Sequence, residues 1–211
     1  MYNIRVSICM TITIIVENSM TKNGVILKTR ETFLHDKPAL FLHYNGGETD
    51  LTLKTEIARW VQGCERLAIM GIGNPLRGDD GVGVEIVNQL TNKVPECVKL
   101  INCEMVPENF LSEIEAYQPT HMLIIDAAEL KAKSGETRLI LPEKMVGTAF
   151  STHIIPLSFL AGIINEVVKS KILVLGIQPY STGFGEELSP ELQMATKKIV
   201  EGISKALMEI K

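Results

Sequence analysis

The stretch that decides the fold is Met70-Gly-Ile-Gly-Asn-Pro-Leu-Arg-Gly-Asp-Asp-Gly-Val-Gly83. The apolar run Leu67-Ala-Ile-Met-Gly-Ile72 leads into it, and an amphipathic segment from Val82 to Leu90 follows it. An apolar run, a glycine-rich loop and an amphipathic segment are the order typical of a strand, a tight turn and a helix. The sequence therefore predicts a strand–loop–helix unit around this loop.

The rest of the chain repeats this alternation of apolar runs and amphipathic segments. We predict strands at 66–72, 98–103, 121–126, 137–141 and 171–177. We predict helices that begin near Asp50, Val82, Pro107, Pro156 and Ser189. Such alternation indicates βαβ units, and an aromatic content of only 5% suits an aliphatic sheet buried on both faces. We expect an α/β fold of three layers (αβα) with a mostly parallel, twisted five-stranded sheet.

Residues 1–48 are expected to form an N-terminal extension, and residues 49–211 a single α/β domain. Between Ile4 and Val16, apolar and polar residues alternate, which is the period of a strand or an edge hairpin. The same run is too short for a membrane span, which needs about 20 apolar residues, and no small-residue cleavage site follows it. The sequence leaves open whether the extension is a small β unit or a tail with no role in the fold.

Charge and cysteine content exclude several classes of partner. The net charge is −4 and the isoelectric point is near 5.6, so no basic field attracts nucleic acid or an anionic membrane. The four cysteines form no CxxC pair, which argues against a structural zinc site or a disulfide framework. Because free thiols suit a reducing compartment, we expect a cytoplasmic protein without a nucleic-acid or membrane partner.

The glycine-rich loop has the shape of a phosphate-binding loop but the wrong charge. A dinucleotide fingerprint needs a third glycine where this chain has Leu76, and a Walker loop needs Lys followed by Ser or Thr where it has Asp79 and Asp80. Carboxylates repel phosphate and attract cations. We assign Asp79 to capping the helix that follows, which leaves Asp80 to face a metal.

Two further residues complete a candidate metal site. Asp126 ends a buried strand, and the carboxyl ends of parallel strands share one edge of a sheet, so Asp126 is expected near Asp80, with Glu104 and Gln178 at the same edge. His153 lies just before a predicted helix. The alternative to a metal-contacting role is that Asp126 only caps the element after its strand and that His153 only packs within the fold. Two carboxylates and an imidazole suit a divalent first-row metal, which indicates a metal-dependent hydrolase or a metal-binding module.

The sequence also resembles a known family, the hydrogenase maturation endopeptidases. These proteases remove a C-terminal extension from the precursor of the large subunit of nickel–iron hydrogenases. The matching motifs occur in the family's order over roughly residues 65–210. They are Gly71-Ile-Gly-Asn-Pro-Leu-Arg-Gly-Asp-Asp-Gly-Val-Gly83, Pro107-Glu-Asn109, Leu123-Ile-Ile-Asp-Ala127, Gly135-Glu136, Thr152-His153 with Pro156-Leu157, and Gly176-Ile-Gln-Pro179.

The resemblance implies a role for each candidate residue. Asp80, Asp126 and His153 match the groups with which the family contacts metal, and the resemblance makes them both catalytic and metal-contacting. In the family these groups recognise nickel already inserted in the precursor, so the nickel is supplied by the substrate and the protein has no cofactor-binding residues of its own. The resemblance implies a nickel-dependent, aspartic-type endopeptidase whose partner is the hydrogenase large-subunit precursor and which is a monomer. A metal-dependent hydrolase or amidase for small molecules, or a non-catalytic nickel-site binding module, remains the alternative.

Overall fold

The computed structural model describes residues 4–8, 12–21, 24–33, 49–145 and 157–208. Contacts divide the chain into two compact units, residues 1–41 and 42–211. The boundary expected after residue 48 lies outside the described residues. The first unit is an antiparallel sheet with the order β1-β2-β3. Its first strand and the start of its second fall in the alternating run 4–16, and the second strand continues beyond that run. These strands are β1 (Ile4–Ile8), β2 (Ile12–Thr21) and β3 (Gly24–Phe33).

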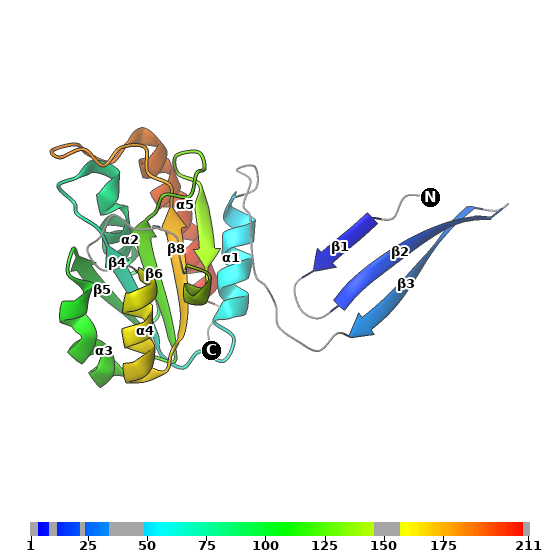
Figure 1. Ribbon diagram of the computed structural model, residues 1–211, viewed down its shortest axis with the longest axis horizontal. Coiled ribbons are helices and arrows are strands. Elements are labelled where there is room, and N and C mark those ends of the chain that lie inside the picture. Colours follow the sequence, from blue (N-terminus) through cyan, green and yellow to red (C-terminus); the bar gives the residue numbers. More distant parts are fainter. Residues whose placement is uncertain (1–3, 9–11, 22–23, 34–48, 146–156, 209–211) are drawn as a thin grey trace. The chain divides into compact units, whose positions relative to one another are not determined.

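The second unit contains the predicted five-stranded sheet (Figure 1). Its strands are β4 (Leu67–Ile72), β5 (Val98–Glu104), β6 (His121–Ala127), β7 (Thr137–Ile140) and β8 (Lys171–Ile177). The strand order is β5-β4-β6-β8-β7, and only the edge strand β7 runs antiparallel to its neighbour. The prediction of a mostly parallel sheet is confirmed, and β4, β6 and β8 are its interior strands, with β6 in the middle.

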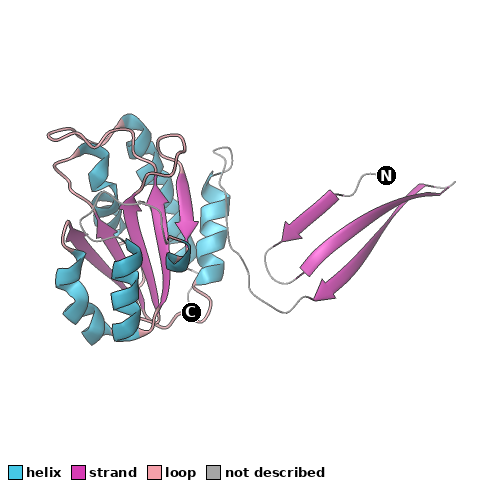
Figure 2. Cartoon of the chain, viewed as in Figure 1, coloured by secondary structure: helices cyan, strands magenta, loops and turns pink. Residues whose placement is uncertain are grey.

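Helices cover both faces of this sheet (Figure 2). One face packs against α1 (Thr49–Trp60), α2 (Val82–Leu90) and α5 (Pro190–Leu207), and the other against α3 (Leu111–Tyr117) and α4 (Leu157–Val168). Side chains of a strand point alternately to its two faces. In β6, Leu123 and Ile125 accordingly join the first core, whereas Met122 and Ile124 join the second. Because both faces are covered, every residue of β6 is buried.

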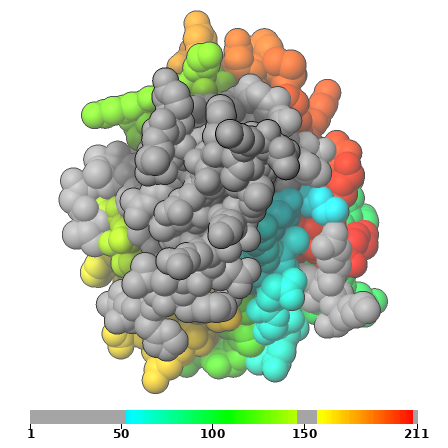
Figure 3. Space-filling view, turned by 90° about the vertical axis from the view of Figure 1, so that its right-hand side faces the viewer, coloured from blue at the N-terminus to red at the C-terminus, as the bar shows by residue number. Residues whose placement is uncertain are grey.

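The helix boundaries follow the local signals in the sequence. The Ser189 hydroxyl accepts a hydrogen bond from the Leu192 N–H, and Pro190 occupies the first turn, as predicted for the start of α5. After α1, Gly63 adopts a φ of +74°, the left-handed conformation in which helices commonly end. In Figure 3, residues of α1 lie beside those of α5, in agreement with the packing between these two helices. In the described part of the chain, no helix has the length and apolar character needed to cross a membrane.

Candidate active site at the carboxyl edge of the sheet

The glycine-rich loop turns sharply because two backbone segments approach each other closely. Gly73 adopts a φ of +143°, and a Cβ atom there would lie 1.9 Å from the carbonyl oxygen of Asp80. After the loop, Gly78–Gly81 form a 3-10 turn that leads into α2. At Gly83 a Cβ would lie 2.3 Å from the carbonyl oxygens of both Ile72 and Ile125. Glycine therefore allows the start of α2 to sit directly against β4 and β6.

This packing brings the two predicted carboxylates to the same edge of the sheet. Asp80 lies in the 3-10 turn, which contacts β6, and Asp126 lies near the carboxyl end of β6 itself. Both side chains are buried, Asp80 at 4% exposure and Asp126 at 0%. One oxygen of Asp80, Oδ2, accepts a hydrogen bond from the N–H of Asn74 at 3.2 Å. The structure thus places Asp80 and Asp126 where the parallel topology predicts them.

The third predicted group, His153, lies outside the described residues. Within the part of the chain that the structure describes, no three or more His, Cys, Asp and Glu side chains are grouped so that they could hold a metal ion. The metal-contacting set Asp80, Asp126 and His153 therefore stays a prediction.

The prediction that Asp79 caps the following helix is wrong. Neither the 3-10 turn nor α2 has a side-chain cap. The Asp79 carboxylate, 1% exposed, instead accepts hydrogen bonds from the N–H groups of Tyr180 (2.7 Å), Ser181 (3.2 Å) and Ser189 (2.7 Å) and from the Ser189 hydroxyl (2.9 Å). Because Ser189 is the N-cap of α5, the carboxylate lies at the N-terminus of α5 rather than α2. Asp79 therefore fastens the loop after β8 beside Asp80.

We expect Asp79→Ala to lower the free energy of unfolding by about 2–3 kcal/mol, because it removes the acceptor from three backbone N–H groups and a hydroxyl. Urea denaturation followed by circular dichroism measures the change. Glu108→Ala is the matched control, since Glu108 is an exposed acid in the first turn of another 3-10 helix. Its stability should stay within about 0.5 kcal/mol of wild type. Equal stability of the two variants would contradict the role of Asp79.

Gln178 follows the end of β8, and the sequence leaves it either a substrate-binding role or a turn role. The structure favours the turn role. Its Oε1 accepts hydrogen bonds from the N–H groups of Leu130 (2.7 Å) and Ala132 (3.3 Å), and its Nε2 donates to the carbonyl oxygen of Pro179 (3.2 Å). Gln178 thus holds the loop that follows Asp126.

His121 is the first residue of β6 and therefore lies at the end of that strand opposite to Asp126. It is 1% exposed, and its ring stacks edge-on against Trp60 of α1 at 5.2 Å between ring centroids. Burial lowers the pKa of the His121 imidazole, and the neighbouring charge of Lys171 acts in the same direction. His121 is therefore a neutral packing residue and not part of the site.

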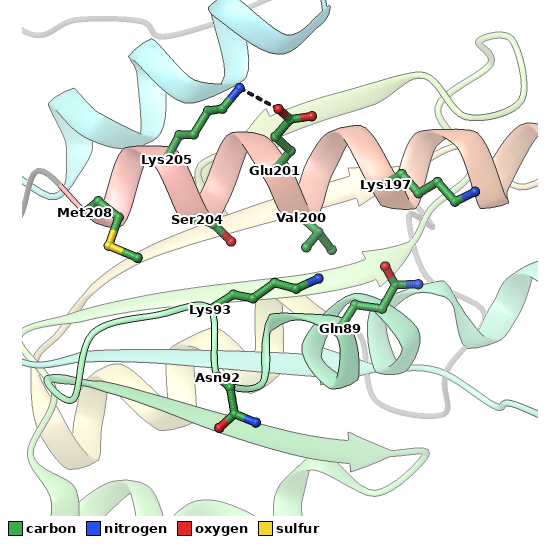
Figure 4. A pocket seen from close by; sticks show the side chains of 9 residues that line it. All are labelled: Gln89, Asn92, Lys93, Lys197, Val200, Glu201, Ser204, Lys205 and Met208. Atoms are coloured by element: carbon green, nitrogen blue, oxygen red, sulfur yellow. Dashed lines mark hydrogen bonds and ion pairs between the residues drawn. The ribbon is translucent and has the colours of Figure 1, made fainter.

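A hollow of about 570 Å³ lies between α5 and the turn after α2 (Figure 4). Lys93, Lys197 and Ser204 are among its lining residues, and Lys205 pairs with Glu201 at 2.5 Å. This hollow borders the carboxyl end of α2, whereas Asp80 precedes the amino end of that helix. It is therefore separate from the candidate active site.

Comparison with known proteins agrees with this geometry. The family model for HycI, hydrogenase maturation protease, matches residues 84–206, more than half of the chain. A protein of Methanocaldococcus jannaschii predicted to be a hydrogenase maturation protease is 34% identical over 159 residues, which cover 72% of this chain and 94% of that protein. The Escherichia coli K12 hydrogenase 3 maturation protease is 28% identical over 134 residues, which cover 63% of this chain and 85% of that protein.

A solved structure shows the same fold. The crystal structure of a [NiFe] hydrogenase maturation protease from Thermococcus kodakarensis superimposes with a TM-score of 0.69 and 34% identity. The match covers 73% of this chain and 99% of that one. Sequence and fold therefore agree, and this chain belongs to the hydrogenase maturation protease family.

Proposed function

We propose that this protein is the endopeptidase that removes the C-terminal extension from the nickel-loaded large-subunit precursor of a [NiFe] hydrogenase. Membership of the hydrogenase maturation proteases supports the protease activity. The observation that carries the assignment to this site is the placement of Asp80 and Asp126 at one edge of the sheet, in elements that contact each other. These two carboxylates arise from separate parts of the chain and are both buried at the carboxyl edge of the sheet.

The chemistry of the carboxylates fits a metal that arrives with the substrate. Two negative carboxylates at one edge of the sheet attract a divalent cation held by the precursor, and their oxygens are suitable ligands for it. Carboxylate and imidazole groups both bind nickel, so Asp80, Asp126 and His153 are the groups we propose to contact it. The N–H of Asn74 holds one oxygen of Asp80 and thereby orients the carboxylate.

In the proposed reaction, one carboxylate acts as general base towards a water molecule. The water oxygen attacks the scissile carbonyl carbon while its proton moves to the carboxylate. The proton then passes to the departing amide nitrogen as the C–N bond breaks, which leaves a new carboxyl terminus on the large subunit and a free amine on the released extension. Nickel in the precursor supplies a Lewis acid that polarises the carbonyl or the water.

Parallel incubations with nickel-loaded and metal-free precursor test this function, with the mass of the precursor as the readout. We expect loss of the extension from the loaded form only, since the proposed contacts are to nickel. Intact loaded precursor after long incubation would refute the protease assignment. Stoichiometric metal in the purified protein, together with cleavage of small amides, would support a metal-dependent amidase instead. Binding of the precursor without cleavage would support a binding module.

We further propose that the protein works in the cytoplasm as a monomer that meets the precursor transiently, without a nucleic-acid or membrane partner. The acidic net charge of −4 supports the absence of a polyanionic partner. Sedimentation at several protein concentrations measures the oligomeric state, and a single species with the mass of one chain is the expected result.

A further inference from the structure

Exposed apolar side chains gather on the loops around Asp80. Among the described residues, five of the nine large apolar side chains that are exposed lie on the loops that follow β4, β5 and β8. Phe184 is 77% exposed, Tyr180 72% and Leu76 64%. We name this group the apolar rim, and its members are Leu76, Met105, Val106, Tyr180 and Phe184.

Backbone hydrogen bonds fasten the three loops to one another. The N–H of Gly185 donates to the carbonyl oxygen of Leu76 at 2.8 Å, which links the loops after β8 and β4. The N–H of Gly73 donates to the carbonyl oxygen of Glu104 at 2.9 Å, which links the loop after β4 to the last residue of β5, where the third loop begins. In Figure 1 the loops after β4 and β8 lie together at the carboxyl end of the sheet. The rim is therefore carried by connected loops and needs little ordering when a partner binds.

The composition of the rim is that of a protein interface. Tyrosine, phenylalanine and methionine are enriched where proteins bind each other, and an exposed cluster of them in water is unfavourable. The exposed charged residues on these loops and at the end of β5 are mostly acidic, with Glu104, Glu186 and Glu187 against Arg77. A fitting partner therefore combines an apolar patch with surrounding basic residues.

We propose that the apolar rim is the docking surface for the body of the hydrogenase large-subunit precursor. This inference rests on the proposed function, because it assumes that the precursor brings its C-terminal segment to Asp80. The rim loops leave the sheet at the edge that holds Asp80, and the N–H of Tyr180 donates to the adjacent Asp79 at 2.7 Å, so a precursor presented to the site reaches the rim. A second copy of this chain is disfavoured as occupant, because it would bring the same acidic residues to the contact and would cover the site.

A matched pair of double variants tests this docking surface. Tyr180→Ala with Phe184→Ala removes two rim side chains, and Phe159→Ala with Met194→Ala removes two apolar side chains from α4 and α5 that are also more than half exposed. We expect the rim variant to raise KM for cleavage of the nickel-loaded precursor about 10- to 100-fold with kcat within about twofold, because docking is lost while the chemistry remains. The control should keep both constants, and both variants should keep the wild-type melting temperature.

A binding measurement separates this inference from the proposed function. In an Asp80→Asn background, the Kd for nickel-loaded precursor is measured with and without the rim substitutions. If the wild-type protein cleaves the precursor, and the rim and control variants have the same KM, the docking surface is overturned and the protease assignment stays intact. If the wild-type protein does not cleave the precursor, but the rim substitutions weaken precursor binding, the docking surface is supported and the protease assignment is overturned. A wild-type dimer that the rim substitutions dissociate would assign the surface to a second copy instead.

Discussion

Asp80→Asn is expected to reduce the rate of precursor cleavage at least about 1000-fold. Asparagine keeps the shape of the side chain, and its carbonyl oxygen can still accept the hydrogen bond from the N–H of Asn74. It loses the negative charge that contacts nickel or takes a proton from water in the proposed mechanism. The effect on the free energy of unfolding should therefore be small, within about 1 kcal/mol. The loss of cleavage rate then reflects the chemical step and not unfolding.

Single-turnover cleavage of nickel-loaded precursor, followed by mass spectrometry, measures this loss. Asp126→Asn should reduce the rate to a similar degree, because both carboxylates belong to the proposed site. Glu108→Gln is the control, since it neutralises an exposed acid that follows the neighbouring strand β5. Its rate should stay within about twofold of wild type. If Asp80→Asn retained more than a tenth of the wild-type rate, Asp80 would not belong to the catalytic machinery.

Gly83→Ala is expected to lower the free energy of unfolding by at least about 4 kcal/mol. The added Cβ would lie 2.3 Å from the carbonyl oxygens of Ile72 and Ile125, which belong to the interior strands β4 and β6. Neither oxygen can withdraw without disturbing the sheet, so α2 has to shift away and the 3-10 turn with Asp80 shifts with it. We also expect precursor cleavage to fall under conditions in which the variant remains folded.

Gly162→Ala provides a matched control for this prediction. Gly162 also lies in a helix, α4, but a Cβ there would have no atom within 4 Å apart from its chain neighbours and the backbone of its own helix. Alanine favours a helix over glycine, so this variant should gain about 0.5–1 kcal/mol. Urea denaturation of both variants measures the two changes. A Gly83→Ala variant as stable as wild type would show that α2 does not need the close contact with these interior strands.

Much of the fold could be predicted because its signals are local. Each strand of the large sheet is a short apolar run, and the helices show apolar residues three or four positions apart, so the αβα layers follow from the pattern. The place of Asp80 and Asp126 at one edge also follows, because the carboxyl ends of parallel strands coincide. The role proposed for His153 rests on the family resemblance, and that residue lies outside the described part of the chain.

The loop 178–189 shows why other features could not be predicted from the sequence. Asp79 looks like a helix cap from its neighbours, but its hydrogen-bond partners lie 101 to 110 residues further along the chain. Gln178 likewise binds backbone groups 46 and 48 residues away. Tyr180 and Phe184 stand among Pro, Ser and Gly, which indicates a loop, but their exposure beside Asp80 is not visible in the pattern.

The sequence by itself determined the strands, the helices, the edge at which the two carboxylates lie and the resemblance to a protease family. Only the tertiary structure decided which acid of the Asp79-Asp80 pair fastens a distant loop, which residues close the turns around the site, and which apolar side chains stay in water. The physical reason is the range of the interactions. Periodicity and turn chemistry act between residues a few positions apart, whereas these hydrogen bonds and exposures depend on segments that meet only after the chain has folded.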